Sequence, residues 1–154
     1  MSQLHQRKRS ESSLSDEYET PLELFESLNL KYNLETELDV CCDDKNIKGT
    51  FRLPDGNSLD YEWKNAYSSD IWCNPPHSLN DVFVRKAYEQ WKKHNINIMM
   101  IIPTNTMSSR YWHECIEGIA EYHPIKGRIR FLVDGKPSKH SSRNAYCVVI
   151  WRKK

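Results

Sequence analysis

Short apolar runs and stretches with apolar residues at helical spacing follow one another along this chain. Residues 96–102 are the most apolar run; they are rich in β-branched side chains and stop at Pro103, which predicts a buried central strand. Shorter runs predict further strands at 37–42, 71–73, 129–133 and 145–151. Apolar residues at helical spacing predict helices at 21–32, 80–93 and 108–120.

Details of these helices can be predicted as well. Thr20 is expected to cap the first helix, with Pro21 at its first position. The second helix is expected to begin at Asn80 or Asp81. Its packing side is expected to consist of Val82, Val84, Ala87, Tyr88 and Trp91.

Strands that alternate with helices predict an α/β fold with a mostly parallel central sheet and helices on both faces. Ligands of such sheets bind beyond the carboxyl ends of the strands. Asp39 and Asn74 both fall at expected carboxyl ends, so a functional site is expected at this edge.

Two segments are expected to lie outside regular structure. Residues 1–16 are polar, Ser-rich and mixed in charge, which is typical of a disordered arm and leaves 17–154 as one folded domain. The polar segment 43–58 includes the turn sequence Pro54-Asp55-Gly56-Asn57.

Composition narrows the class of protein. No apolar stretch approaches the roughly 20 residues of a membrane span, and the first residues lack the apolar core of a secretory signal. The five cysteines, at 41, 42, 73, 115 and 147, form no C-x-x-C pair. An odd number without such pairs favours free thiols in a reducing, cytoplasmic compartment over disulfides or a metal site.

The net charge of +1 hides an asymmetry along the chain. Residues 123–154 hold nine Lys or Arg and a single acid, Asp134, which favours a surface that meets a polyanion. The expected phosphate contacts are Arg128, Arg130, Lys136, Lys139 and Arg143.

Residues 70–78 read DIWCNPPHS, in which two prolines end an apolar strand. Neither proline donates a backbone hydrogen bond, and Asn74 before them is pushed out of the helical region, so a stiff corner results. Two rigid acceptors, the Asn74 side-chain oxygen and the Pro75 carbonyl, would localise the nitrogen lone pair of an aromatic amine such as that of adenine. An aromatic side chain at the fourth position can stack on the base.

Asn74-Pro75-Pro76-His77 resembles the (D/N/S)-P-P-(Y/F/W) motif of amino-group methyltransferases that use S-adenosylmethionine. From about residue 17 to 151 the chain also resembles the phage-type Dam DNA N6-adenine methyltransferases. The matching stretches are YETP at 18–21, LDVC at 38–41, IWCNPP at 71–76, GRIRF at 127–131 and VVIW at 148–151.

The resemblance implies a Rossmann-like methyltransferase domain, S-adenosylmethionine as methyl donor, S-adenosylhomocysteine as product and no metal. DNA is the implied partner, and N6 of adenine the implied target. The implied catalytic residues are Asn74, Pro75, Pro76 and His77. The implied cofactor-binding residues are Thr20, Pro21, Asp39, Val40, Cys41 and again Asn74. A phage or prophage origin would place the protein in the host cytoplasm or nucleoid.

The chain departs from the family pattern at three places. His77 replaces the usual Tyr or Phe, a glycine-rich loop is missing after Val40, and residues 142–145 read SRNA where a Gly-Ser pair is usual. Methylation of RNA, methylation of cytosine N4 and a silent nucleic-acid-binding subunit therefore stay open as alternatives. A protein glutamine methyltransferase, which shares the corner, is disfavoured by the basic C-terminal quarter. A homodimer or a partner subunit is the expected source of additional target recognition.

Overall fold

The structure of the protein is a computed structural model that describes residues 18–41, 48–49, 51–52, 58–64 and 70–154. The expected arm at 1–16, Cys42 and the turn at 54–57 lie outside the described residues.

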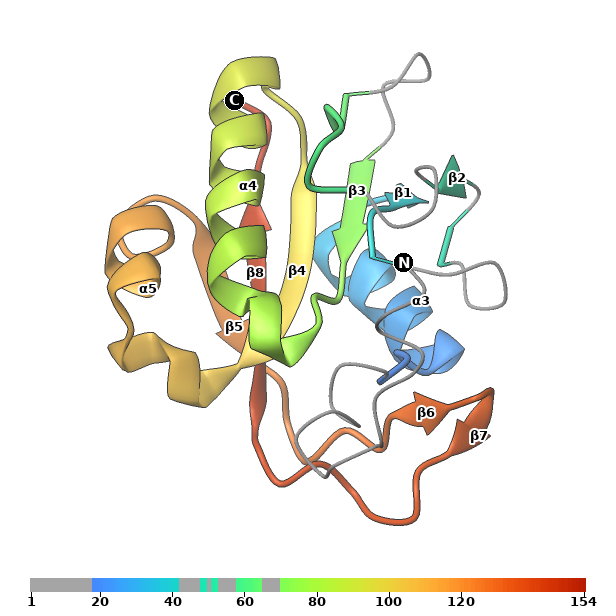
Figure 1. The fold of residues 1–154 in the computed structure, drawn as a ribbon. Coiled ribbons are helices and arrows are strands. Elements are labelled where there is room, and N and C mark those ends of the chain that lie inside the picture. The colour runs from blue at the N-terminus through green and yellow to red at the C-terminus, as the bar shows by residue number, and fades with distance from the viewer. Residues whose placement is uncertain (1–17, 42–47, 50, 53–57, 65–69) are drawn as a thin grey trace.

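A six-stranded sheet with the order β2-β1-β3-β4-β8-β5 forms the centre of the fold (Figure 1). The neighbours from β2 to β4 pair in parallel, whereas β8 is antiparallel to both β4 and β5. The strands are β1 (Thr36–Asp39), β2 (Phe51–Arg52), β3 (Asp70–Cys73), β4 (Ile98–Pro103), β5 (Glu121–Pro124) and β8 (Tyr146–Trp151). The α/β class is therefore confirmed, but the sheet that was expected to be mostly parallel is mixed, because β8 runs antiparallel to both of its neighbours.

The direction of β8 follows from the path of the chain before it. β5 ends at Pro124, and β8 begins at Tyr146, which pairs with Pro103 at the carboxyl end of β4. Residues 125–145 therefore start and finish at the carboxyl edge of the sheet, so the chain can only re-enter the sheet running back. The hairpin of β6 (Leu132–Val133) and β7 (Lys136–Pro137) lies within this segment.

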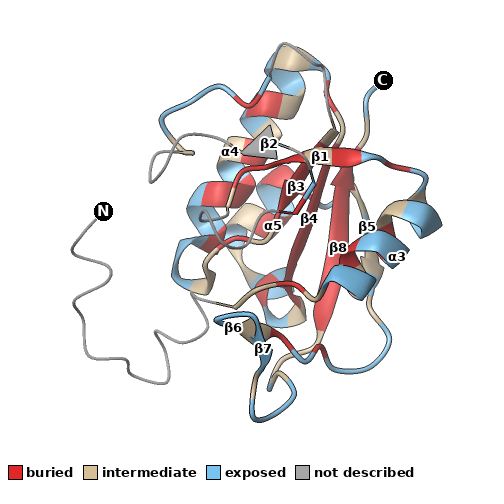
Figure 2. Cartoon of the chain, turned by 90° about the vertical axis from the view of Figure 1, so that its right-hand side faces the viewer, coloured by how far each residue is buried: buried red, intermediate tan, exposed pale blue. Residues whose placement is uncertain are grey.

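Helices cover both faces of the sheet, as expected (Figure 1). α3 (Leu22–Tyr32) packs on one face, where it joins Trp72, Met99 and Ile101 in one core cluster. α4 (Asn80–His94) and α5 (Arg110–Cys115) pack on the other face with Ile71 and Met100. Because successive strand residues point to opposite faces, β4 supplies both clusters. Figure 2 shows the central strands buried and the outer sides of the helices exposed.

Two short 3-10 helices, η2 (His77–Leu79) and η3 (Thr104–Ser108), follow β3 and β4. The helix expected at 108–120 is wrong in extent, because only Arg110–Cys115 is α-helical, Ser108 ends η3, and residues 116–120 form turns and a bend. Val82 was expected on the packing side of α4 but is 44% exposed, whereas Phe83 is buried. The buried positions Asn80, Phe83, Val84 and Ala87 follow the helical period from the observed first residue.

The strand expected at 129–133 is wrong in extent and in place, since only Leu132 and Val133 form a strand, β6, which pairs with β7 in the hairpin and, through Leu132, with Glu19. Ile129 and Phe131 are apolar because they pack in the core cluster on the α3 side. The edge strand of the main sheet is instead β5, whose four residues are half-buried or exposed. Such a strand gives little hydrophobic signal.

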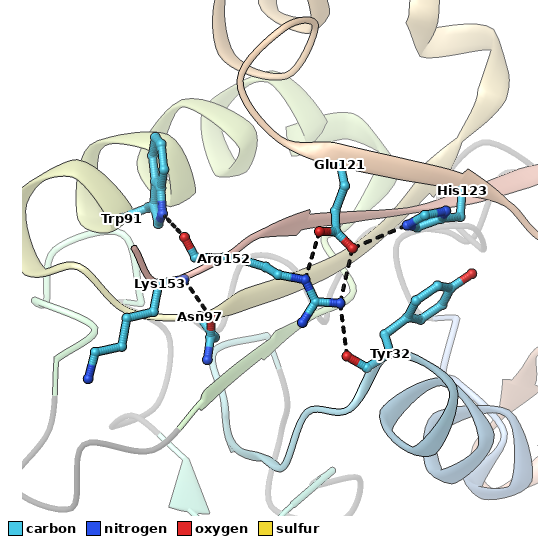
Figure 3. Close-up of polar contacts among 7 residues, drawn as sticks. All are labelled: Tyr32, Trp91, Asn97, Glu121, His123, Arg152 and Lys153. Carbon is cyan, nitrogen blue, oxygen red and sulfur yellow. Dashed lines mark hydrogen bonds and ion pairs between the residues drawn. The ribbon is translucent and has the colours of Figure 1, made fainter.

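A cluster of polar contacts holds the end of the chain to the sheet (Figure 3). Arg152 donates from Nε and Nη2 to the two carboxylate oxygens of Glu121, at 2.7 and 3.0 Å, and from Nη2 to the Tyr32 carbonyl at 2.9 Å. Trp91 Nε1 donates to the Arg152 carbonyl at 2.7 Å. The cluster joins β5, the last turn of α3 and α4 at the amino end of the parallel strands.

Replacing Arg152 by Met should lower the free energy of unfolding by about 1–2 kcal/mol at neutral pH, because three hydrogen bonds to a partly exposed guanidinium are lost. Arg152 is the main reason that the pKa of Glu121 lies below its ordinary value. The part of the stabilisation that comes from Glu121 is therefore complete above the ordinary glutamate pKa of about 4.3 and is lost as the pH falls through the lowered value, whereas the bond to the Tyr32 carbonyl does not titrate. Urea unfolding at several pH values measures both effects.

Lys153→Met is the matched control, since the Lys153 side chain points away from the cluster in Figure 3 and its backbone contact is kept. An equal loss in both variants, or a loss in Arg152→Met that does not shrink as the pH falls below the ordinary glutamate pKa, would contradict the assignment.

Candidate active site

The carboxyl ends of β1 and β3 lie side by side. Asp39, the last residue of β1, pairs with Trp72, and the Val40 amide donates to the Trp72 carbonyl at 3.1 Å. Asn74 follows the end of β3 directly. The expectation that Asp39 and Asn74 fall at the same edge of the sheet is confirmed.

The Asn-Pro-Pro-His corner, residues 74–77, leads from β3 into α4 without an intervening loop. Pro75 is buried, and Asn74, Pro76 and His77 are half-buried. Pro76 is extended (φ −55°, ψ 133°), and its carbonyl accepts the Leu79 amide at 2.8 Å to begin η2. Within the described ranges, the structure shows no hydrogen bond to the carbonyl of Pro75. Both ends of the corner are therefore fixed by regular structure.

The side-chain amide of Asn74 has one defined orientation. Its Nδ2 donates to the Tyr18 carbonyl and to the Thr20 hydroxyl oxygen, each at 3.1 Å. Because a backbone carbonyl only accepts, the amide nitrogen and not the oxygen must face Tyr18. The Asn74 Oδ1 atom is thereby left as an acceptor, and no donor to it is found among the residues that the structure describes.

Residues 18–20 connect the corner to the basic segment 126–144. Glu19 and Leu132 exchange two backbone hydrogen bonds of 2.9 Å each. Thr20 is 2% exposed, and the expected capping role is wrong, because α3 has no side-chain cap and begins after Pro21. Thr20 instead places its hydroxyl against Asn74, and so brings an expected cofactor residue to the corner.

Asp39 joins Cys41, just after β1, to Lys48. It is 3% exposed, and its two oxygens accept the amides of Cys41 at 3.0 Å and Lys48 at 2.8 Å. Gly49 lets the returning chain pass close to β1: its φ is +83°, and a Cβ there would lie 2.6 Å from the Glu37 carbonyl oxygen. A buried carboxylate that accepts backbone amides is a rigid support for the neighbouring site.

The remaining cofactor-binding predictions lie at the same place. Val40 is buried beside Trp72, and the Cys41 sulfur lies 3.4 Å from the sulfur of Cys73, the residue before Asn74. None of Cys41, Cys73, Cys115 and Cys147 is in a disulfide, as expected. Among described side chains, no group of three or more His, Cys, Asp or Glu is placed to hold a metal ion.

The five predicted phosphate contacts are all exposed and all lie between residues 126 and 144. Two of them also brace this segment: Arg128 Nη1 donates to the Arg143 carbonyl at 2.9 Å, and Arg130 Nε to the Ser138 carbonyl at 2.8 Å. Lys136 lies in β7, next to the Asp134-Gly135 turn with φ values of 52° and 76°. Positive φ at both residues is typical of a tight two-residue hairpin.

Sequence reasoning missed three aromatic residues around the corner, namely Tyr18, Phe131 and Tyr146. Tyr146 contacts His77 through its hydroxyl, at 2.6 Å from Nε2. Burial raises the pKa of Tyr146 to about 12. The apolar run that begins near Tyr146 predicts a strand and burial, but it carries no signal for a partner 69 residues away.

A surface hollow of about 530 Å³ lies elsewhere, beside Trp91, Ile119 and Arg152. It is at the amino end of the parallel strands, opposite the corner, so the chemistry-bearing residues and this hollow belong to different parts of the surface. In the part of the chain that the structure describes, no helix is long and apolar enough to cross a membrane.

The α/β fold and the proline corner at its ligand-binding edge fit the class of amino-group methyltransferases that the motif resembles. Residues 7–154 match the family described as DNA N-6-adenine-methyltransferase (Dam). The chain belongs to this family.

Two phage proteins, each named DNA N-6-adenine-methyltransferase, are similar to this chain. The protein of Escherichia phage T1 is 31% identical over 136 residues, which cover 87% of this chain and 55% of its own length. That of Haemophilus phage HP1 (strain HP1c1) is 28% identical over 128 residues, or 82% of this chain and 72% of its own length. The chain thus spans about half of the first relative. No solved structure matches it.

Thr20→Val should lower the free energy of unfolding by about 1 kcal/mol, because valine keeps the shape of threonine but leaves one N–H of Asn74 without its acceptor. Thr20→Ser should restore most of the loss. Thr104→Val, in η3, is the matched control. Equal urea midpoints for Thr20→Val and the wild type would show that the contact does not hold the corner.

Proposed function

We propose that the protein transfers a methyl group from S-adenosylmethionine to the exocyclic N6 of adenine in DNA and releases S-adenosylhomocysteine. The observation that supports this most directly is the fixed amide of Asn74, whose nitrogen is bonded to Tyr18 and Thr20 and whose oxygen remains an acceptor. Family membership and the names of the two phage relatives agree with this substrate.

Two acceptors would act on the target amine. Asn74 Oδ1 and the Pro75 carbonyl would each accept one N–H of the amino group, which favours a pyramidal nitrogen with a localised lone pair. Both acceptors are held by short, rigid connections, so little reorganisation is needed at the moment of reaction. The amine loses its proton only after a carbon–nitrogen bond has formed, so no strong general base is needed beside it.

The methyl donor would lie where β1 and β3 end, held by Thr20, Pro21, Asp39, Val40 and Cys41 together with Asn74. S-adenosylmethionine supplies an electrophilic methyl group on a sulfonium sulfur. The fit is supported by Asp39, whose carboxylate accepts the amides of Cys41 and Lys48 at the edge where an α/β sheet binds its ligands. On this basis we assign the domain to the Rossmann-like methyltransferase fold.

The DNA would contact the basic segment 126–144. An adenine in a duplex must leave the base stack to reach a buried acceptor, while the phosphates are held by basic side chains. Because residues 18–20 pair with Leu132 and touch Asn74, the basic segment is attached to the corner itself. RNA remains an alternative substrate, since the corner contacts an amino group and not a sugar.

Asn74→Ala should lower kcat for methyl transfer by a factor of about 10²–10³, the loss that typically follows removal of one preorganised hydrogen-bond partner. Asn74→Asp keeps an acceptor but replaces the donating NH₂, so its loss should be smaller. The assay follows label from S-adenosylmethionine into unmethylated DNA and resolves the digested nucleosides. The expected product is N6-methyladenine.

Asn97→Ala is the control, because Asn97 lies at the opposite edge of the sheet, where it bonds Asp70 and Lys153. The Asn97→Ala variant should be less stable than the wild type but should still catalyse methyl transfer. Label in RNA but not in DNA would favour the alternative substrate. No label in either, with binding of DNA retained, would favour a silent subunit.

Lys136→Glu and Lys139→Glu should weaken DNA binding about equally for all sequences, and each should reduce the slope of log K against log salt by about one. Lys31→Glu, on the exposed side of α3, changes the net charge by the same amount and is the matched control. Fluorescence anisotropy with a labelled duplex at several salt concentrations measures the slopes. Unchanged slopes for both test variants would remove segment 126–144 from the DNA-binding surface.

A further inference from the structure

A hydrogen bond joins the last residue of the corner to the first residue of β8. The Tyr146 hydroxyl oxygen lies 2.6 Å from Nε2 of His77. Tyr146 is 1% exposed, and burial raises its pKa to about 12, so the phenol keeps its proton. A protonated phenol can donate to an unprotonated imidazole nitrogen, while its oxygen can accept from the hydroxyl of Ser142, the second side-chain partner of Tyr146.

Three aromatic side chains pack next to the imidazole of His77 and are called the aromatic support: Tyr18, Phe131 and Tyr146. The Tyr18 ring meets that of His77 edge to face, with centroids 6.0 Å apart, and the Tyr146 centroid lies 5.6 Å from that of His77. Phe131 stacks on Tyr18 at 5.0 Å and meets Tyr146 edge to face at 4.9 Å. Each ring of the support therefore contacts the other members or the imidazole itself.

The aromatic support also contacts the side-chain amide of Asn74, through Tyr18. Tyr18 accepts a hydrogen bond from Asn74 through its backbone carbonyl, while its ring contacts His77. Tyr146 restricts rotation of the imidazole about the Cβ–Cγ bond of His77. A hydrogen bond of 2.6 Å to one ring nitrogen sets the plane of the ring. The acceptor at position 74 and the ring at position 77 are thus oriented together.

We infer that Tyr146 is a positioning residue, whose hydroxyl donates to Nε2 of His77, places the imidazole proton on Nδ1, and fixes the ring as the stacking surface for the target base. The stacking of the target base on His77 rests on the proposed function. The tautomer of His77 that Tyr146 sets does not. His77 and Tyr146 form a matched pair. A phenylalanine at position 77 would offer no acceptor, and the Tyr146 hydroxyl would lose this partner while buried.

The tautomer can be measured in the protein without DNA or methyl donor. Long-range ¹H–¹⁵N spectra distinguish Nδ1–H from Nε2–H imidazole, and the spectrum of His77→Phe identifies the signals of His77 among the six histidines. We expect Nδ1–H in the wild type and a shift toward Nε2–H in Tyr146→Phe. An Nε2–H ring in the wild type, or a tautomer that Tyr146→Phe leaves unchanged, would overturn the inference.

The consequence for activity is tested with Tyr146→Phe, His77→Phe and the double variant. Tyr146→Phe should lower kcat about tenfold with the KM for the methyl donor unchanged, since only the placement of the base is affected. The double variant should be no slower than His77→Phe alone, because the hydroxyl acts through the imidazole. Independent, additive losses would contradict this coupling.

Tyr122→Phe, at a 41% exposed tyrosine on β5, is the control and should leave both the spectrum and kcat unchanged. If the wild type methylates no nucleic acid, the proposed function fails while the spectra still decide whether Tyr146 sets the tautomer of His77.

Discussion

Strand β4 is buried at every one of its six residues, and the rest of the fold follows from the need to cover it. Its side chains enter two separate core clusters, so helices are required on both faces of the sheet. Its backbone groups pair with β3 on one side and β8 on the other, which leaves no edge of this apolar strand exposed. The carboxyl ends of β1 and β3 lie at one edge of this sheet, which is the edge where α/β sheets bind ligands.

Residues 18–20 and the basic segment 126–144 both lie at this edge. Residues 18–20 pair with Leu132 and contact Asn74, so the N-terminal segment lies between the corner and the basic segment. Asp39 bonds the two ends of the loop after β1. The candidate site is therefore assembled from parts of the chain that are far apart in sequence, and its geometry depends on long-range contacts more than on any single element.

The sequence was informative where burial is complete and the relevant contacts are local. Strands β3, β4 and β8 are dense apolar runs, and the strand-end rule correctly placed Asp39 beside Asn74. The sequence was misleading at 129–133, which is not a strand of the main sheet. Two backbone carbonyls of this segment accept the amides of Ser138 and Ser142. Periodicity does not distinguish an apolar loop that packs into the core from a strand.

The contacts within the site that sequence reasoning missed are long-range polar contacts. Thr20 has the side chain of a helix cap and lies before a helix, yet its hydroxyl bonds a residue 54 positions away. Tyr146 begins a strand that any apolar pattern would predict, yet its hydroxyl bonds a residue 69 positions away. Such contacts are decided by the assembled fold, so no window of neighbouring residues contains them.

His77 shows how such a contact changes the interpretation of a motif. Read alone, an imidazole in place of a larger aromatic ring suggests a weaker platform, because less area is available for stacking. The hydrogen bond between Tyr146 and His77 and the ring contact with Tyr18 restrict the rotation of this ring, so less conformational entropy would be lost if a base stacks on it as proposed. A small ring held in one orientation can thus replace a larger ring that rotates more freely, provided that Tyr146 accompanies it.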